Sequence, residues 1–222
     1  MKCPYCNHSR TYLLKTYQRK CSLCQRKFSP QKYQREYNIA YCFCDDKSAK
    51  QCASELNLNY ITVKKRYENY RRSIAVFLEE EYQGKSSIEY DEYIYLPKSK
   101  KKIQKNIFDA QNFLTFCFDT SKVYNLLMPN LNRFKQELLN DDMDELYFKE
   151  FSKFMRFNKI AKISKKENTI SQFWSFFENS ITMYKGVSNE NFIYYLKEFE
   201  FKFNYNKEQR KDILISLQKE NS

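Results

Sequence analysis

Four cysteines near the start of the chain have the spacing of a metal site. Cys3 and Cys6 form one Cys-x-x-Cys pair, Cys21 and Cys24 form a second, and fourteen residues separate the pairs. Two residues between cysteines let both thiolates of a tight turn face one ion, and two such turns complete a tetrahedral site for Zn²⁺. The sequence therefore predicts a structural zinc ribbon over residues 1–30.

The remaining reactive groups exclude several kinds of site. The single histidine, His8, could replace one zinc ligand, although a surface position beside the ligands suits it better, and it leaves no histidine for a Ser-His-Asp or Cys-His site elsewhere. The two glycines, Gly84 and Gly186, are too few for a Gly-rich phosphate loop or a dinucleotide fingerprint. The other cysteines lack a paired spacing and are expected to be small core residues or free thiols: Cys42, Cys44, Cys52 and Cys117.

Acidic residues mark two points of the chain where metal-dependent chemistry is conceivable. Asp91 lies within the alternating apolar run 88–96, and Asp141 and Asp142 follow a possible strand at 134–139. Nucleases of the RNase H type place carboxylates at these two points, where they hold two Mg²⁺ ions that activate a hydroxyl and stabilise the leaving oxygen. Taken singly, the same residues would be interpreted as solvent-facing acids of a turn or a sheet edge.

Positive charge is concentrated in the N-terminal third of the chain. The 222 residues carry a formal net charge of +12, and residues 1–72 hold 16 Lys and Arg against 5 Asp and Glu, a net of +11. Residues 73–222 hold the other 23 and 22, a net of +1. Such an uneven field is typical of a protein that binds nucleic acid through one end, while a basic surface that serves only solubility is the simpler alternative.

Residues 48–72 predict a helix-turn-helix. A turn at 57–59 lies between two short amphipathic segments, and Leu58 in this turn can fill the core. The apolar positions are Ala49, Cys52, Ala53 and Leu56 in the first helix and Ile61, Val63 and Tyr67 in the second. A short helix, a turn and a basic second helix form the unit that enters the major groove of DNA, although an ordinary helical hairpin would show a similar pattern.

The second helix of this unit supplies the expected contacts to DNA. Its side chains Thr62, Lys64 and Lys65 are expected to face base edges. Three arginines are expected to contact phosphate oxygens, which position a protein without reading the sequence: Arg66, Arg71 and Arg72.

From residue 88 onward the pattern predicts an α/β domain with a mixed sheet. The expected elements are strand 88–96, a hairpin of 106–110 and 113–118 around Gln111 and Asn112, helix 120–128 between a Thr120 or Ser121 cap and Pro129, strand 134–139, helix 144–155, strand 157–163, helices 168–183 and 189–204, and a charged final helix. Three strands, helix, strand, helix, strand and helix is the order of an RNase H-like domain. The aromatic residues of 168–183 are most simply helix core: Phe173, Trp174, Phe176 and Phe177.

The fold class is therefore α+β, and composition sets the domain boundaries. The expected parts are the ribbon at 1–30, a Tyr-rich connector (31–44) and the helix-turn-helix within 31–78, a charged linker at 79–87, an RNase H-like domain at 88–205 and a C-terminal helix at 206–222. The chain has no run of about 18 apolar residues and no apolar signal segment, so we expect a cytoplasmic protein without a membrane partner.

Four stretches of the chain resemble the zinc-ribbon insertion-sequence transposases of the ISXO-like DDE type. They are the ribbon CPYC…CSLC…KFS, the helix-turn-helix around ASELNLNYITV, the strand EYDEYIYLP, and the C-terminal stretch that runs from NTISQFWSFFENS to KFNYN. The last stretch is similar to the family's Asn-Thr-Ile-Glu-x-Phe-Trp signature and is the most specific of the four. The resemblance covers most of the chain.

The resemblance implies the residues of a catalytic site. Asp91 would be the first catalytic acid. The second would be Asp142, by its spacing to Tyr147, or Asp141, by its nearness to the end of a strand. The third metal-site position falls on Asn168, and together these residues would hold Mg²⁺ or Mn²⁺.

Three departures from the family pattern bear on activity. The family Glu after Thr-Ile is Ser171 here, the family Lys further along that helix is Glu178, and Leu96-Pro97 replaces Gly-Gly after the first strand. Glu178 cannot stand in for Asn168, because ten residues of helix separate them by about 15 Å. The neutral amide oxygen of Asn168 is a weaker ligand for a hard cation than a carboxylate.

The expected function is that of an insertion-sequence transposase. Such a protein would bind double-stranded DNA at the terminal repeats of its element and at the target, would cleave and join strands with Mg²⁺ or Mn²⁺, and would act as a homo-oligomer in the nucleoid. A catalytically decayed, sequence-specific DNA-binding protein or regulator is the main alternative. An RNA-binding ribbon protein is a weaker one.

Overall fold

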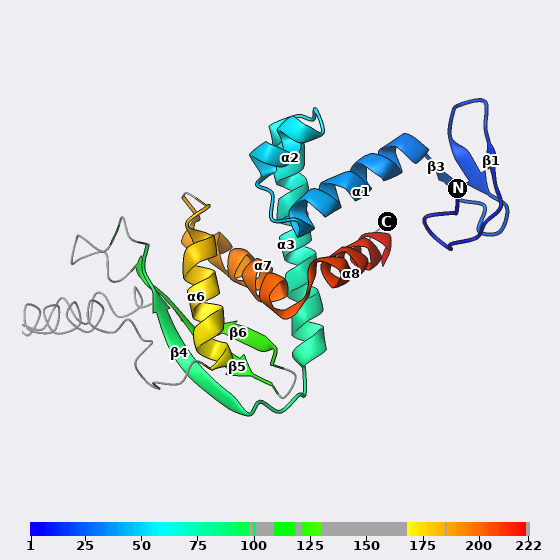
Figure 1. The fold of residues 1–222 in the computed structure, drawn as a ribbon. Coiled ribbons are helices and arrows are strands. Elements are labelled where there is room, and N and C mark those ends of the chain that lie inside the picture. The colour runs from blue at the N-terminus through cyan, green and yellow to red at the C-terminus, as the bar shows by residue number, and fades with distance from the viewer. Residues whose placement is uncertain (98–99, 101–108, 119–120, 130–167, 185, 221–222) are drawn as a thin grey trace, which may run out of the picture. The chain divides into compact units, whose positions relative to one another are not determined.

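The computed structural model describes residues 1–97, 100, 109–118, 121–129, 168–184 and 186–220. The chain divides into two compact units, one made of Met1–Ile74 with Tyr205–Ser222 and the other of Ala75–Asn204 (Figure 1). The first unit thus combines segments from both ends of the sequence. Among the described helices, none has the length and the apolar character needed to cross a membrane.

The N-terminal residues form the predicted ribbon. Strands β1 (Thr11–Leu13), β2 (Arg19–Cys21) and β3 (Lys27–Phe28) make an antiparallel sheet in the order β1-β2-β3. Its small core contains Cys3, Cys21 and Phe28, with Tyr5 and Cys24 packed against it. So few buried side chains cannot stabilise a sheet of this size alone, which is why the ribbon depends on its cysteine cluster.

The segment expected as a connector is instead a helix, α1 (Pro30–Cys44). Ser29 caps it by accepting a hydrogen bond at 3.3 Å from the backbone N–H of Lys32, and Pro30 occupies the first helical position. Three tyrosines spaced four residues apart stack along one side of the helix, with ring centroids 6.4 and 4.4 Å apart: Tyr33, Tyr37 and Tyr41. The buried side of the helix is formed by residues in its second half, among them Ile39, Ala40 and Phe43, while the tyrosines are partly buried.

Two helices separated by a turn follow where the sequence predicted them, as α2 (Ala49–Glu55) and α3 (Tyr60–Tyr82). Ser48 and Gln51 form a reciprocal capping box at the start of α2. In the turn, Asn57 adopts the left-handed conformation with φ of 51°, which asparagine tolerates better than most residues. Helix α3 continues to Tyr82, so residues 79–82 of the charged segment predicted as a linker extend the helix.

Contacts between aromatic side chains join helix α1 to helix α3. The ring of Phe43 lies edge-on to Tyr67 at 5.0 Å and to Tyr70 at 5.6 Å. The Tyr67 hydroxyl donates to the carbonyl of Lys47 at 3.1 Å and so ties α3 to the loop before α2. Cys42, Cys44 and Cys52 are buried in this unit, as expected for small core residues.

The C-terminal helix α8 (Lys207–Glu220) completes the same unit by packing against α1. Arg210 donates through Nη1 to the carbonyl of Cys44 at 3.2 Å and through Nε to the carbonyl of Tyr205 at 2.8 Å. Its Nη1 also lies 3.4 Å from Asp46 Oδ2. The helix predicted as a separate part at 206–222 therefore belongs to the N-terminal unit, because a buried guanidinium needs acceptors and α1 provides them.

The second unit contains a three-stranded antiparallel sheet, in the order β4 (Glu89–Tyr95), β5 (Gln111–Cys117) and β6 (Val123–Leu127). The first strand was predicted, but two expectations were wrong. Gln111 and Asn112 start β5 rather than forming a turn. Residues 123–127 are a strand paired with β5, not part of a helix at 120–128.

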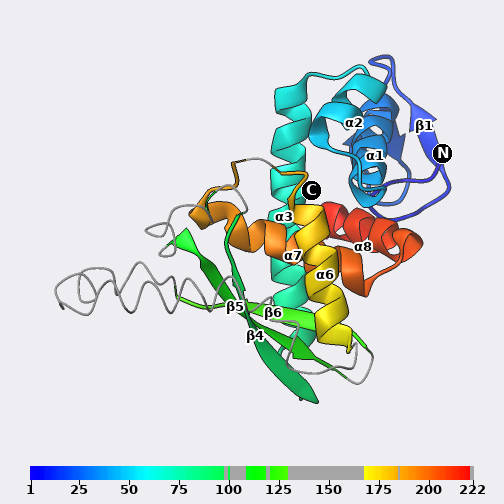
Figure 2. The same cartoon turned by 60° about the vertical axis from the view of Figure 1, so that its left-hand side comes forward.

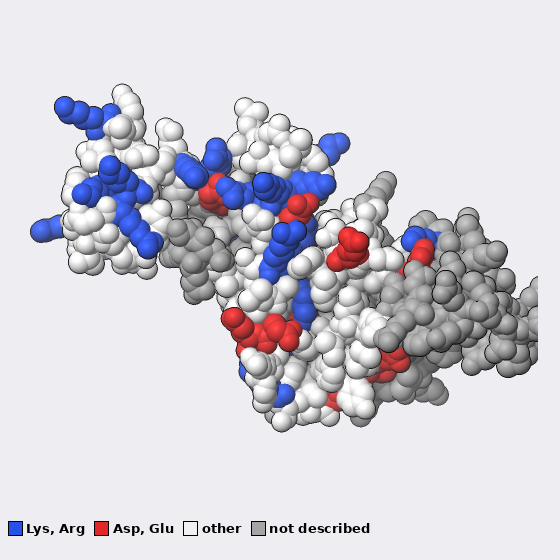
Figure 3. Space-filling view, turned by 180° about the vertical axis from the view of Figure 1, so that it is seen from behind, with Lys and Arg blue, Asp and Glu red and all other residues white. Residues whose placement is uncertain are grey.

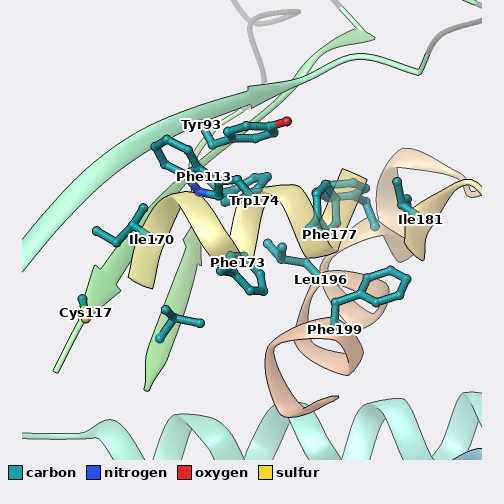
Figure 4. Close-up of a cluster of buried hydrophobic side chains, with 12 residues drawn as sticks. Tyr93, Phe113, Cys117, Ile170, Phe173, Trp174, Phe177, Ile181, Leu196 and Phe199 are labelled. Carbon is teal, nitrogen blue, oxygen red and sulfur yellow. The ribbon is translucent and has the colours of Figure 1, made fainter. Parts of the chain in front are cut away.

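Two helices pack on one face of this sheet. Helices α6 (Thr169–Ile181) and α7 (Phe192–Asn204) follow the predicted ranges, and the short 3-10 helix η3 (Asn189–Asn191) leads into α7. Both helices lie on the same side of the sheet in Figure 2. The core between them is aromatic, and it includes the residues shown in Figure 4: Tyr93, Phe113, Phe173, Trp174, Phe177 and Phe199.

The architecture is therefore α+β, with two small antiparallel sheets in the described residues. The expected strands 134–139 and 157–163 and helix 144–155 lie outside these residues, and so does the mixed sheet that they would complete. The meander β4-β5-β6 matches the expected order only at 88–96 and 113–118, because β6 lies where a helix was expected and most of the expected strand 106–110 is outside the described residues.

Candidate metal centre and nucleic-acid interface

The four predicted cysteines meet at one point of the ribbon. Their Sγ atoms all lie within 4.8 Å of one another, with 3.6 Å between Cys3 and Cys24 and between Cys6 and Cys21. A tetrahedral Zn²⁺ with ligand bonds of about 2.3 Å requires sulfurs about 3.8 Å apart. The cluster therefore has the ligand type and the dimensions of a structural zinc site, and among the described residues it is the only group of metal-ligating side chains of this kind.

The two halves of the cluster share one backbone pattern. The N–H of Cys3 donates to the carbonyl of His8 at 2.9 Å, and the N–H of Cys21 donates to the carbonyl of Arg26 at 3.1 Å. The residue after each second cysteine is left-handed, with φ of 57° at Asn7 and 59° at Gln25. Two equivalent tight turns thus present two sulfurs each, as the Cys-x-x-Cys spacing predicts.

Hydrogen bonds favour the thiolate form of Cys21. Burial raises the pKa of this thiol, but backbone N–H groups of Cys24 and Leu23 and the neighbouring thiols outweigh it and lower the pKa from 9.0 to about 7. The N–H of Leu23 lies 3.4 Å from the sulfur. In Cys6, the partner of Cys21, a backbone hydrogen bond at His8 lowers the pKa, but burial and the neighbouring thiols outweigh it and raise the pKa to about 11. A thiolate is the form that binds zinc. His8 takes part only through its backbone, so the cluster needs no histidine ligand.

Helix α3 exposes most of the side chains predicted to contact DNA. Thr62, Lys64, Lys65 and Arg72 are exposed. Lys64 lies 4.0 Å from Glu68, a surface pair that water and salt screen strongly. Figure 3 shows that Lys and Arg side chains gather over the ribbon and the helix-turn-helix, whereas Asp and Glu are more frequent elsewhere on this face.

Two of the predicted arginines are engaged within the protein. Arg66 pairs with Glu36 of α1, at 2.8 Å from Nε to Oε2 and 3.1 Å from Nη2 to Oε1. Arg71 is only 4% exposed, and its guanidinium lies 6.0 Å from the Phe43 ring. Arg71 therefore stabilises the helical core, and Arg72 is the better candidate for a phosphate contact.

The sequence pattern misassigned the first turn of α3. Ile61 was grouped with Val63 and Tyr67 as one apolar face, but Val63 and Tyr67 are buried while Ile61 is 71% exposed. Positions two apart on a helix do not share a face, and this spacing was the available signal. Tyr60 is exposed as well. The turn that is expected to enter the major groove thus carries apolar side chains without a core to bury them.

Asp91 occupies the middle of β4, as predicted. It pairs in register with Thr115 of β5, so its side chain lies on the face that α6 and α7 cover, and it is partly exposed. Its Oδ1 accepts a hydrogen bond from the N–H of Glu92 at 2.8 Å. Asp141 and Asp142 lie outside the described residues. The part of the chain that the structure describes therefore provides one acid of the expected set and does not complete a magnesium site.

A buried polar row, which the sequence did not predict, extends from Thr115 across the sheet. The Thr115 hydroxyl donates to Asn125 Oδ1 at 2.7 Å and accepts from Trp174 Nε1 at 2.9 Å. Asn125 donates through its backbone and side chain to Glu200 at 2.8 and 3.0 Å, and Lys197 pairs with the same carboxylate at 3.1 Å. Burial raises the pKa of Glu200 in spite of these partners.

Asn168 has a structural role at the start of α6. Its Oδ1 accepts a hydrogen bond from the N–H of Ser171 at 2.8 Å, and the Ser171 hydroxyl accepts from the N–H of Asn168 at 3.0 Å. This reciprocal pair is a capping box in which Ser171 takes the place usually held by Glu or Gln. Glu178, near the other end of α6, accepts a hydrogen bond from Tyr93 at 2.5 Å, so it is separated from Asn168 as expected.

Replacement of Asn168 tests its role as the cap of α6. We expect Asn168→Ala to lower the free energy of unfolding by about 1 kcal/mol, because one backbone donor of α6 loses its partner. Asn168→Asp should stay within a few tenths of a kcal/mol of the native chain, since Asp caps as well as Asn. Urea unfolding followed by circular dichroism measures both, and equal stability of the alanine variant would contradict the capping role.

Comparisons of the chain with family models, with curated proteins and with solved structures give no match.

Proposed function

We propose that this protein binds double-stranded DNA through its zinc ribbon and its helix-turn-helix. The observation that carries the proposal is the first half of α3, which follows a tight turn and exposes Thr62, Lys64 and Lys65. Residues 1–35 add nine Lys and Arg and contain no Asp or Glu. A cationic surface attracts the DNA backbone by releasing condensed counterions, and the N-terminal residues of such a helix read base edges.

We further propose that the DNA-binding unit serves an insertion-sequence transposase. The resemblance in the ribbon, the helix-turn-helix, β4 and α6 supports this, and so does the position of Asp91 in the middle of the first strand of an antiparallel meander. In this proposal the protein binds the terminal repeats of its element as a homo-oligomer and cleaves and joins strands with Mg²⁺ or Mn²⁺. Asp141 or Asp142 would contribute the second acid.

The alternative function is DNA binding without catalysis, as in a decayed transposase or a regulator. Asn168 and Ser171 favour it, because the side chains at these two positions are committed to capping α6. Glu178 supports it too, since its carboxylate binds Tyr93 instead of lying free for a substrate. A protein of this kind would retain the exposed cations of α3 and would need neither Asp91 nor Asn168 for metal binding.

Cleavage of the DNA that flanks the gene distinguishes the two functions. Purified protein would be incubated with that DNA and Mg²⁺ or Mn²⁺, and 3′-end cleavage and strand joining would be measured. We expect activity that Asp91→Ala abolishes. Glu92→Ala is the matched control, because Glu92 is an exposed acid on the same strand whose side chain faces the opposite side of the sheet.

The binding step is tested separately with the same DNA. Lys64→Ala and Lys65→Ala should each weaken binding, and each should reduce the dependence of log affinity on log salt by about one if the lysine contacts a phosphate. Binding that persists without cleavage would contradict the transposase and support the regulator. No binding to duplex DNA, with the four-cysteine site loaded, would contradict both.

A further inference from the structure

The first turn of α3 exposes an apolar side chain next to exposed lysines. Ile61 is 71% exposed and Tyr60 is 50% exposed, while the buried positions of this part of the helix are Val63, Tyr67 and Tyr70. The core of the unit is closed without Ile61. Exposed lysines follow within one turn of the helix, at Lys64 and Lys65.

The position of Ile61 is fixed by the chain around it. Asn59 Oδ1 accepts a hydrogen bond from the N–H of Ile61 at 2.8 Å, and the N–H of Val63 donates to the carbonyl of Asn59 at 3.2 Å. The Asn59 bond satisfies a donor that the helix start would otherwise leave without a partner. Ile61 is therefore held at the very end of the helix, which in a helix-turn-helix is the part nearest the bases.

Only one group in the major groove favours an apolar contact of this kind. The base edges present donors and acceptors, and the single apolar group among them is the C5-methyl of thymine. The lysines near Ile61 favour a polyanion as the partner. An apolar protein surface bound at this position would remove water from their charged groups, which is unfavourable. Resting on the proposed DNA binding, we infer that Ile61 is a specificity-determining residue that contacts a thymine methyl group in the recognised duplex.

The expected magnitude follows from the size of the contact. Burial of one methylene-sized apolar group is worth about fourfold in affinity at 25 °C. Removal of the thymine methyl should therefore weaken binding about fourfold without changing base pairing or backbone charge. Deoxyuridine makes this change, since it differs from thymidine only at that methyl.

The experiment uses the full zinc-loaded chain and a pool of random duplex DNA. After selection of a bound sequence, each thymine is replaced singly by deoxyuridine, and dissociation constants are measured for the native chain, Ile61→Ala and Ile61→Val. We expect at least one thymine whose replacement costs the native chain and Ile61→Val about fourfold. Ile61→Ala should bind the original duplex more weakly than the native chain does. Replacement of that thymine by deoxyuridine should not weaken its binding further, and this non-additivity in a double-mutant cycle indicates a direct contact.

Val76→Ala is the matched control. Val76 is 59% exposed, is also apolar and lies on α3 outside its first turn, so its replacement should leave the deoxyuridine effect intact. Because Ile61 is exposed, the alanine variant should keep the native thermal stability. The inference would be overturned, and the proposed DNA binding would remain, if no deoxyuridine substitution changed the dissociation constant of the native chain. The same holds if the substitutions weakened binding equally in the native chain and in Ile61→Ala. A chain that enriches no duplex would overturn the proposed function together with the inference.

Discussion

Replacement of Cys21 by serine should remove zinc and unfold the ribbon. Cys21 is buried, and its sulfur is one of four that lie within 4.8 Å of one another. Structural zinc supplies about 10–16 kcal/mol of apparent binding energy in domains of this size, and the few buried side chains of the ribbon cannot replace it. We expect one equivalent of bound zinc in the native chain and none in Cys21→Ser, measured by elemental analysis of the purified proteins.

Cys117→Ser is the matched control for this prediction. Cys117 is also a buried cysteine, but it lies on β5 of the second unit and takes no part in the cluster. It should retain one zinc, and helices α1 to α3 should stay folded in both variants when amide exchange is measured. A Cys21→Ser chain that keeps stoichiometric zinc and a protected ribbon sheet would show that the four sulfurs are not the ligand set.

Replacement of Phe177 by alanine should lower the stability of the second unit by about 3–5 kcal/mol. Its side chain is fully buried, and its ring lies 5.2 Å from Tyr95, 5.6 Å from Phe113 and 5.6 Å from Phe199. The variant would leave a cavity among side chains from the sheet, α6 and α7. Denaturant unfolding monitored by the fluorescence of Trp174, which lies in the same core, reports on this unit.

Tyr90→Ala is the control for the core substitution. Tyr90 is an aromatic residue of the same unit, but it is 68% exposed on the other face of the sheet. Its loss should change the free energy of unfolding by about 0.5 kcal/mol or less. Comparable destabilisation by both replacements would mean that Phe177 is not at the centre of the core.

The elements that were predicted from the sequence are those with a local cause. Cysteine spacing alone placed the ribbon, and the apolar spacing on both sides of the turn at 57–59 placed the helices α2 and α3. Helix α1 also had local signals, a Ser29-Pro30 start and tyrosines four residues apart, that a search for aliphatic periodicity overlooked. The helix α1 could therefore have been predicted from the sequence.

The remaining differences have causes far apart in the chain. Residues 123–127 carry a helix cap and a proline stop nearby, yet they form β6 because β5 offers a partner edge and the resulting alternation buries Val123 and Asn125. The polar row ends on Glu200, which is 75 residues from Asn125. No pattern within a window of the sequence could have joined these two residues.

For the candidate site too, the sequence predicted some features correctly and missed others. The cluster of four cysteines follows from their spacing, and the exposure of Lys64 and Lys65 follows from their charge. Burial of Arg71 does not follow from either, because it depends on how α3 packs against α1 through Phe43 and Tyr67, and the exposure of Ile61 was missed although its spacing from Val63 indicated it. Residue type alone therefore identifies the metal site better than it identifies the surface that would meet DNA.

The position of α8 in the first unit has a consequence for the order in which the protein is made. Arg210 bonds to Cys44, a partner 166 residues earlier in the chain. While the ribosome is still synthesising the second unit, α1 to α3 have no α8 to pack against, and the buried carbonyl of Cys44 lacks its guanidinium donor. We expect a chain that ends within the second unit, through a frameshift or a premature stop codon, to have a less stable first unit, because α1 then lacks its packing partner. The last residues to be synthesised therefore contribute to the stability of a unit whose other residues are synthesised first.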